Sequence, residues 1–122
     1  MPQTDDRPIV AITMGDAAGV GPEIIIKALE QQSTHDCCCP LVVGDIRVME
    51  RARAMLGSPL ELRAVAEPIQ ARFTHPTVDV LDLHNVDWSQ VRPGTVCAEA
   101  GRAAVECMMR TIELALAGEV QA

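Results

Sequence analysis

The sequence lacks the segments that would place a protein in a membrane or direct it to export. None of its 122 residues belongs to a stretch approaching the ~18 consecutive apolar residues of a membrane-spanning helix. The opening MPQTDDRP carries acidic residues where a signal peptide has basic residues followed by an apolar segment. These absences predict a cytoplasmic protein with no membrane partner.

Runs of basic residues are missing as well. The chain has 17 Asp and Glu residues against 10 Lys and Arg residues, a formal net charge of −7. Because an acidic chain without a basic cluster is repelled by a phosphate backbone, the composition argues against nucleic acid as a partner. Hydrophobic residues make up 48% of the chain, enough to form a core, so disorder is not expected.

The cysteines and histidines form no pattern typical of a disulfide framework or a metal site. The five cysteines include the consecutive run Cys37–Cys39 but no CxxC motif, and adjacent cysteines cannot easily close an unstrained disulfide. We expect this run at a loop and strand entry in a reducing compartment. The spacing of His35, His75 and His84 is not that of metal ligands, so we expect loop or surface positions and assign no metal ligand.

No catalytic residue can be assigned either. The sequence offers no convincing Ser/His/Asp or Cys/His arrangement. Cys97 and Cys107 fall in the pattern of one long helix, where we expect them to pack.

What the sequence does contain is an alternation of strand and helix patterns. Strands are expected at residues 9–14, 41–43, 60–65 and 78–83, helices at 22–31, at about 45–56 and at about 95–117, and a helical turn between 66 and 77. The run Ile9–Met14 favours a strand covered on both faces. In the longest helix, Gly101 and Ala103 would let another helix approach closely. The alternation predicts an α/β fold with parallel strand pairing.

The stretch GDAAGVGPE, residues 15–23, follows the first strand, at the end where open α/β sheets bind ligands. Gly15, Gly19 and Gly21 permit positive φ or close approach of another molecule. Asp16 and Glu23 stabilise the start of the next helix but would repel a pyrophosphate, so contacts to ribose, adenine or polar groups are expected. The spacing GxxxGxG fits neither GxGxxG nor GxxxxGK[ST]. The pattern alone leaves open a purely structural turn or a ligand-lining loop.

The segment VAITMGDAAGVGPEIIIKAL, residues 10–29, resembles the N-terminal signature ITMGDPAG[VI]GPE of the 4-hydroxythreonine-4-phosphate dehydrogenase family. The resemblance continues in order through PLVVGD, LELRAV, ARF and PGTVCAEAGRAAVECMMRTIELALAGEVQA, and covers nearly the whole chain. The later segments are most similar to the branch that oxidises D-threonate or D-erythronate 4-phosphate.

The resemblance implies a three-layer α/β sheet with flanking helices, similar to isocitrate and isopropylmalate dehydrogenases. It further implies a cytoplasmic homodimer that uses NAD and a divalent metal to oxidise and decarboxylate a four-carbon phosphorylated hydroxy acid. On this basis the residues expected to contact the cofactor are Gly15, Asp16, Gly19, Val20 and Gly21.

Two departures from the family pattern affect these expectations. Ala17 stands where the family usually has proline. The family's lysine, G-H-T-E stretch and three metal-binding histidines follow the part that residues 1–122 resemble, so we expect an N-terminal portion that is inactive alone. The alternatives are a phosphate acetyltransferase-like enzyme of the same broad fold and a non-catalytic folding or dimerisation module.

Overall fold

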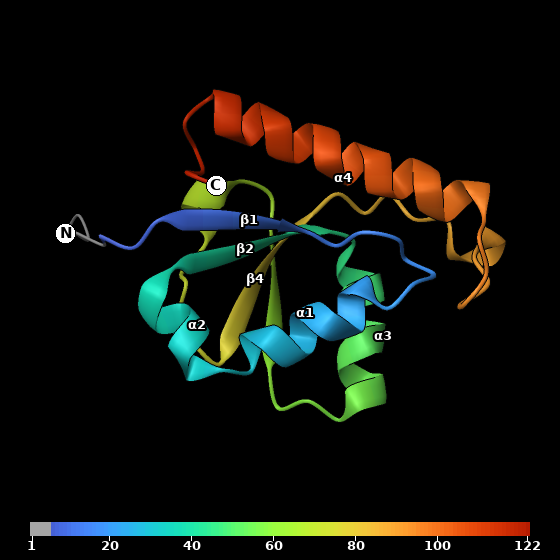
Figure 1. Cartoon of the computed structure of the whole chain (residues 1–122), viewed down its shortest axis with the longest axis horizontal. Helices are drawn as coiled ribbons and strands as arrows, with labels where there is room; N and C mark the ends of the chain where they lie inside the picture. Colours follow the sequence, from blue (N-terminus) through green and yellow to red (C-terminus); the bar gives the residue numbers. More distant parts are fainter. Residues whose placement is uncertain (1–5) are drawn as a thin grey trace.

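The computed structural model describes residues 6–122, which form one four-stranded parallel sheet with helices on both faces (Figure 1). The elements are β1 (Ile9–Thr13), α1 (Gly21–Leu29), α2 (Gln32–Cys37), β2 (Cys39–Gly44), α3 (Ile46–Leu56), β3 (Glu61–Val65), the 3-10 turns Pro68–Gln70 and Trp88–Gln90, β4 (Thr77–Asp82) and α4 (Ala98–Leu116). The strand order is β1-β2-β4-β3. The predicted α/β fold with parallel pairing is confirmed. No helix within residues 6–122 is long and apolar enough to cross a membrane.

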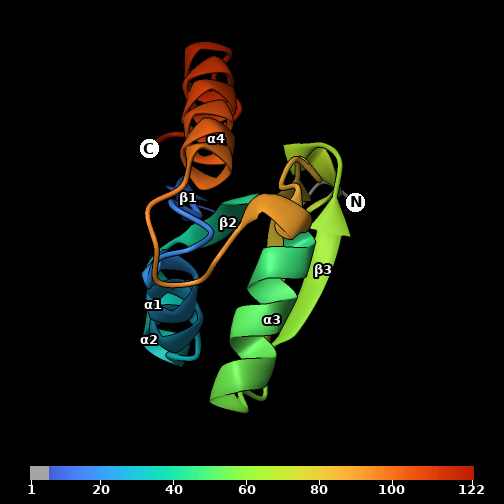
Figure 2. The ribbon, with the colours of Figure 1, turned by 90° about the vertical axis from the view of Figure 1, so that its right-hand side faces the viewer.

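The direction of each connection explains which face of the sheet it covers. The chain moves from β1 to β2 to β3 in one direction across the sheet and then turns back to β4. Because crossovers between parallel strands are right-handed, a reversal of direction moves the connection to the opposite face. Accordingly, α1 and α3 pack on one face, whereas the 66–76 connection and α4 lie on the other (Figure 2).

Two apolar clusters fill the space between the sheet and its helices. Val42 and Val80 face Ile26 of α1 and Met49 of α3, all fully or almost fully buried. On the other face the main buried residues are Leu41, Val43, Val65, Leu81, Cys107, Leu114 and Val120. Every residue of β2 is buried because β2 lies between two strands and is covered on both faces.

The first strand departs from its expected environment. The residues of Ile9–Thr13 are half-buried or exposed, so the expectation of a strand fully covered on both faces is wrong. The reason is its place at the edge of the sheet, where β2 is its only full-length partner among the strands of residues 6–122.

Residues near the end of the chain lie along the free edge of β1. The Gln121 and Ala122 amides donate to the Ile9 carbonyl at 2.9 and 3.3 Å, and the Ala11 amide donates to the Ala122 carbonyl at 2.8 Å. Bonds that flank Val10 in this way are the pattern of a parallel pair between Val10 and Ala122. Residues 121–122 therefore extend the parallel arrangement beyond β1.

The helices differ from the sequence prediction in two respects. The pattern at 22–31 becomes α1, and the short helix α2 follows it where no helix was expected. In α4, the buried face consists of Ala100, Ala103, Cys107 and Leu114. Gly101 is exposed, and a Cβ built there meets nothing within 4 Å, so no helix of residues 6–122 makes the expected close approach at Gly101.

Gly44 and Gly101 provide a matched test of glycine packing. A Cβ at Gly44 would lie 2.6 Å from Met14 Cβ and 2.9 Å from Met14 Sδ, and Met14 is only 1% exposed. We predict that Gly44→Ala destabilises the fold by about 1–3 kcal/mol through overpacking. Gly101→Ala should instead stabilise α4 by about 0.5–1 kcal/mol. Urea unfolding of both variants checks this, and a shift in the same direction for both would contradict it.

Candidate functional site

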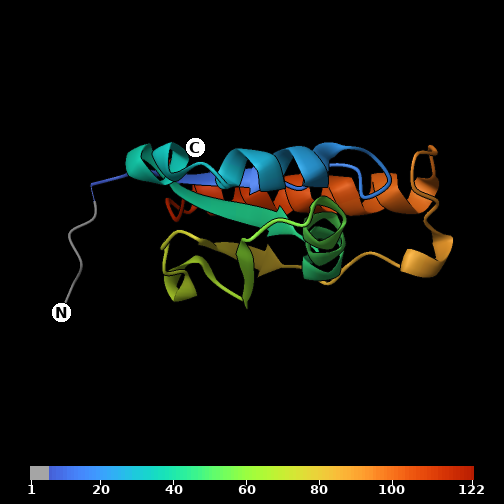
Figure 3. The same ribbon diagram turned by 90° about the horizontal axis from the view of Figure 1, so that it is seen from below.

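The candidate site lies at the carboxyl edge of the sheet. Because all four strands are parallel, the segments that follow β1, β2 and β4 lie along one edge of the sheet (Figure 3). Asp45 comes directly after β2, and Asp82 is the last residue of β4. The connections that leave β2 and β4 run to opposite faces of the sheet. Such a switch between neighbouring strands is where open α/β sheets form ligand crevices.

The Gly15–Gly21 loop begins with a tight turn stabilised by its own acid. Gly15 has a φ of +79°, which favours glycine. The Ala18 amide donates to Asp16 Oδ1 at 2.7 Å, and the Gly19 amide donates to the Asp16 carbonyl at 3.0 Å. The Asp16 side chain therefore has a structural role in the turn whether or not it also contacts a ligand.

The five predicted cofactor contacts differ in how freely another molecule could reach them. Asp16, Gly19 and Val20 are exposed, Val20 by 63%, whereas Gly15 and Gly21 are partly buried. Val20 is the residue before α1, and its apolar side chain makes no capping hydrogen bond to that helix start. The open part of the predicted contact set is thus Asp16, Gly19 and Val20, next to the uncapped amides of the first turn of α1.

The neighbours of the loop hold it firmly against the core. Ala17 and Ala18 are 3% and 5% exposed, and the Gly94 amide donates to the Ala18 carbonyl at 2.7 Å. A Cβ at Gly21 would lie 2.7 Å from the Met14 carbonyl oxygen, whereas one at Gly19 would make only an ordinary contact, 3.5 Å from the Asp16 carbonyl oxygen. Glycine is therefore required by the fold at position 21, but not at position 19.

This difference predicts opposite outcomes for two substitutions in the same loop. Gly21→Val should destabilise the fold by about 1–3 kcal/mol, because the backbone carbonyl of Met14 must move. Gly19→Val should change stability by less than about 1 kcal/mol. Thermal unfolding of the two variants beside the parent chain measures both effects. Equal losses would show that the fold needs glycine at both positions.

Asp45 was not singled out by the sequence, yet it organises this edge. Its side chain is completely buried and accepts from the Arg47 amide at 2.9 Å, from Arg47 Nε and Nη2 at 3.1 and 2.7 Å, and from the Val86 amide at 3.0 Å. Arg47 Nη2 also donates to the Val86 carbonyl at 2.8 Å. Burial alone would raise the pKa of Asp45, but these hydrogen bonds outweigh it and hold the pKa below its ordinary value. Asp45 thereby links β2, α3 and the segment after β4.

Asp82 and His84 lie beside Asp45 but do not make a convincing metal site with it. The three side chains place ligand atoms within 4.8 Å of one another. However, both Asp45 oxygens already accept hydrogen bonds, and the Arg47 guanidinium beside them would repel a cation. Asp82 Oδ1 accepts from the Ile46 and His84 amides at 3.0 and 2.9 Å. These three side chains therefore do not fit a divalent metal. In the sequence, the only sign of this group was an acidic residue at or directly after the end of β2 and of β4.

His35 contradicts the expectation of a loop or surface histidine. It lies in α2 and is 2% exposed, and among the residues that the structure describes neither ring nitrogen meets a partner with good hydrogen-bond geometry. The ring of His75 packs edge-on at 5.0 Å, and His75 Nε2 lies 3.0 Å from the Glu30 carbonyl oxygen. Burial, followed by the proximity of His75, lowers the pKa of His35, while a weaker interaction with the Gln31 backbone acts in the opposite direction. His35 is therefore a neutral core residue.

The buried imidazole predicts a loss of stability in acid. Since the folded pKa lies below the ordinary value of about 6.5, the unfolded chain binds more protons as the pH falls below about 6.5. The stability that neutral His35 contributes is complete above that pH and declines below it. His35→Leu should weaken this decline, while the exposed-site control His84→Gln should leave it unchanged. Urea midpoints at about pH 5 and pH 7.5 test this, and parallel declines in both variants would refute it.

The two later cysteines take packing positions, as expected, although only one lies within the helix. Cys97 precedes α4 and packs against the first apolar cluster. Cys107 is completely buried, and burial raises the pKa of its thiol to about 11. A thiol held neutral in this way is a poor nucleophile, so Cys107 belongs to the core.

The architecture defines a parallel α/β protein with a glycine-rich turn at the carboxyl edge of its sheet. The family model described as "Pyridoxal phosphate biosynthetic protein PdxA" matches residues 36–122. The chain belongs to this family. The glycine-rich turn itself precedes the matched residues and is covered by the comparison with individual relatives.

Those relatives are named as dehydrogenases. The chain is 48% identical over 118 residues to a protein of Symbiobacterium thermophilum provisionally named D-threonate 4-phosphate dehydrogenase, covering 97% of this chain and 35% of the relative. It is 43% identical over 111 residues to the D-threonate 4-phosphate dehydrogenase of Cupriavidus necator, covering 91% and 33%. The chain thus spans about a third of the length of the curated relatives it matches.

The fold is shared with a solved structure. The 4-hydroxythreonine-4-phosphate dehydrogenase of Burkholderia phymatum aligns with a TM-score of 0.90 and 37% identity, covering 95% of this chain and 35% of that one. The resemblance to this dehydrogenase family, inferred from the sequence motifs, is confirmed.

Proposed function

We propose that the chain forms the cofactor-facing part of an NAD-dependent dehydrogenase that acts on a four-carbon phosphorylated hydroxy acid. The observation that supports this most directly is the exposed Gly19–Val20 turn at the carboxyl edge of the sheet, in a chain whose relatives are named D-threonate 4-phosphate dehydrogenases. D-Threonate or D-erythronate 4-phosphate is the proposed substrate class.

In this proposal the loop contacts the ribose or adenine part of NAD. Gly19 and Val20 offer exposed backbone, and the Asp16 carboxylate lies at the surface with Oδ1 engaged in its own turn. A carboxylate is a good acceptor for ribose hydroxyls, whereas Asp16 together with Glu23 in the first turn of α1 disfavours a pyrophosphate there. Gly15 and Gly21 shape the turn from within.

The proposed chemistry also calls for a divalent metal, which when bound would polarise the developing carbonyl and assist decarboxylation. The cluster that comes closest among the described residues, Asp45, Asp82 and His84, does not fit such an ion, for the reasons given above. This chain's own contribution is therefore to bind and orient the cofactor. We propose that its 122 residues alone do not catalyse the reaction, and that the active enzyme is a cytoplasmic homodimer.

The first test of the proposal measures NAD binding by the chain. Calorimetric titration should detect NAD binding, and Gly19→Val should weaken it at least about tenfold because a side chain would occupy the contact surface. Gly101→Ala is the matched control and should leave binding unchanged, because Gly101 is exposed in α4 and a Cβ there meets nothing within 4 Å. Equal affinity in both variants would leave the loop without a cofactor role.

Turnover is tested with the same preparation. With D-threonate or D-erythronate 4-phosphate, NAD and Mg²⁺, we expect no NADH formation, because the described residues do not assemble a metal site or an acid–base group in one cleft. Metal-dependent NADH formation would contradict the proposal that these 122 residues bind the cofactor but do not catalyse the reaction alone.

A further inference from the structure

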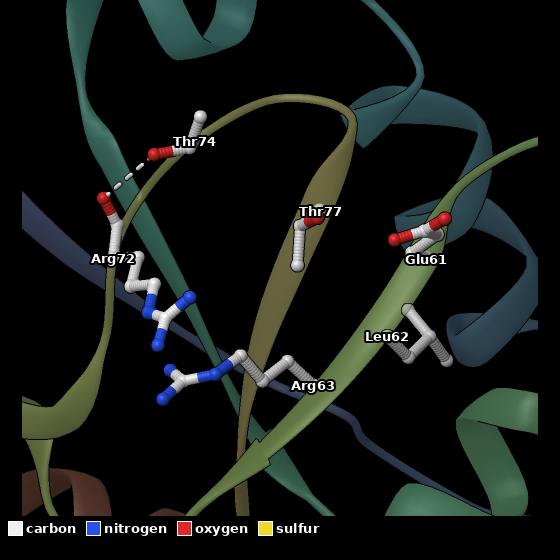
Figure 4. A pocket seen from close by; sticks show the side chains of 6 residues that line it. All are labelled: Glu61, Leu62, Arg63, Arg72, Thr74 and Thr77. Atoms are coloured by element: carbon white, nitrogen blue, oxygen red, sulfur yellow. Dashed lines mark hydrogen bonds between the residues drawn. The ribbon is translucent and has the colours of Figure 1, made fainter.

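A pocket lies at the opposite edge of the sheet from the candidate cofactor loop. It has a volume of about 370 Å³ and is lined by Glu61, Leu62, Arg63, Arg72, Thr74 and Thr77 (Figure 4). Glu61 and Thr77 begin β3 and β4, so the pocket is at the amino ends of these strands. Since all strands are parallel, the Gly15–Gly21 loop lies at the other end of the sheet.

Two guanidinium groups point toward each other across this pocket (Figure 4). Arg63 Nη1 donates to the Gln70 carbonyl at 2.6 Å and lies 3.3 Å from Asp79 Oδ1, but Arg63 Nε and Nη2 have no partner within residues 6–122. The Arg72 guanidinium has no hydrogen-bond or ion-pair partner in the same part of the chain. Facing cations repel each other, and an oxyanion between them would remove the repulsion while accepting several hydrogen bonds.

One buried carboxylate positions both arginines. Asp79 is 1% exposed, and its Oδ2 accepts from the Arg72 and Phe73 amides at 3.1 and 2.9 Å. Its Oδ1 pairs with Arg63, which lies opposite Asp79 in the β3–β4 register. Asp79 thereby fixes the backbone that carries Arg72 and the side chain of Arg63. The Arg63 side chain and the Arg72 backbone are thus held in place before any ligand arrives, which reduces the entropy lost on binding.

The other lining residues leave room for a ligand with one anionic end. The Thr77 hydroxyl lies between the arginines and Glu61 and has no hydrogen-bond partner among the described residues, so it can donate (Figure 4). Asp79 offsets the charge of Arg63, which leaves the charge of Arg72 uncompensated at the arginine end. Glu61 lies at the far side, and the volume exceeds what a single phosphate group needs.

We propose that this pocket binds the phosphate group of a small phosphorylated molecule through Arg63, Arg72 and Thr77, at a site separate from the proposed cofactor loop. Guanidinium groups suit this ligand because their planar forks match the oxygens of a phosphate. The site is a local anion receptor in a chain whose net charge is −7. It depends on the β3–β4 register and the 66–76 connection, and not on the identity of the dehydrogenase substrate.

The test is an NMR titration of ¹⁵N-labelled full chain with inorganic phosphate and with glycerol phosphate, at constant ionic strength set by NaCl. Saturable shifts are expected at the amides of Arg63, Thr74 and Thr77, with the Gly15–Gly21 amides unchanged. Tighter binding of glycerol phosphate than of inorganic phosphate is expected, because the pocket has room for the organic part. Absence of saturable shifts, or shifts only at Gly15–Gly21, would overturn the proposal. Equal affinity for the two probes would overturn the part of the proposal that gives the ligand an organic group beside its phosphate.

Substitutions identify the residues responsible. Arg72→Gln should weaken phosphate binding at least about tenfold, whereas Arg92→Gln, an equal charge change at an exposed residue outside the pocket, should change it less than about twofold. Arg72→Lys should fall between the two, because lysine keeps the charge but lacks the fork. If Arg72→Gln does not fold, the weaker binding expected of Arg72→Lys still tests the role of Arg72. Equal affinities for the Arg72 variants and the Arg92 control would overturn the proposal.

Discussion

The completely buried carboxylate of Asp45 is the interaction on which the carboxyl edge of the sheet depends. Its two oxygens bring together the end of β2, the start of α3 and the segment after β4, by accepting from Arg47 and Val86. That segment continues to Gly94, whose amide holds the Ala18 carbonyl of the glycine-rich loop. The position of the proposed cofactor contacts thus depends on the ion pair between Asp45 and Arg47. A neutral side chain at position 45 could not satisfy the same set of donors.

Asp79 has the corresponding role at the other edge, with a different result. Asp45 is satisfied by an arginine that bends back over it, which closes the switch point between β2 and β4. Asp79 instead takes two backbone amides and only one contact from Arg63, so much of the arginine fork stays open. Two buried aspartates, one directly after β2 and one within β4, therefore produce a closed structural joint at one end of the sheet and an open anion pocket at the other.

Much of this arrangement could be predicted from the sequence, because it depends on local patterns. The apolar runs located the strands, the helix expected at about 45–56 is α3, which ends at Leu56, and GDAAGVGPE marked the turn after β1. The strand order could not be predicted, since nothing local places β4 between β2 and β3. For the same reason the burial of His35 and the convergence of Arg63 and Arg72 were missed: each depends on a contact between distant segments, and the six-residue α2 is too short to show a periodic pattern.

The pairing of residues 121–122 with β1 joins parts of the chain that are 112 positions apart, as in the bond from the Ile9 amide to Gln121 Oε1 at 2.8 Å. Closing so large a loop carries an entropy loss that only the finished sheet and α4 can offset. This pairing should consequently form after β2 and β4 have assembled, and its amides should exchange with solvent before those of the central strands. The β1 edge of the sheet is thus the part that we expect to form last during folding.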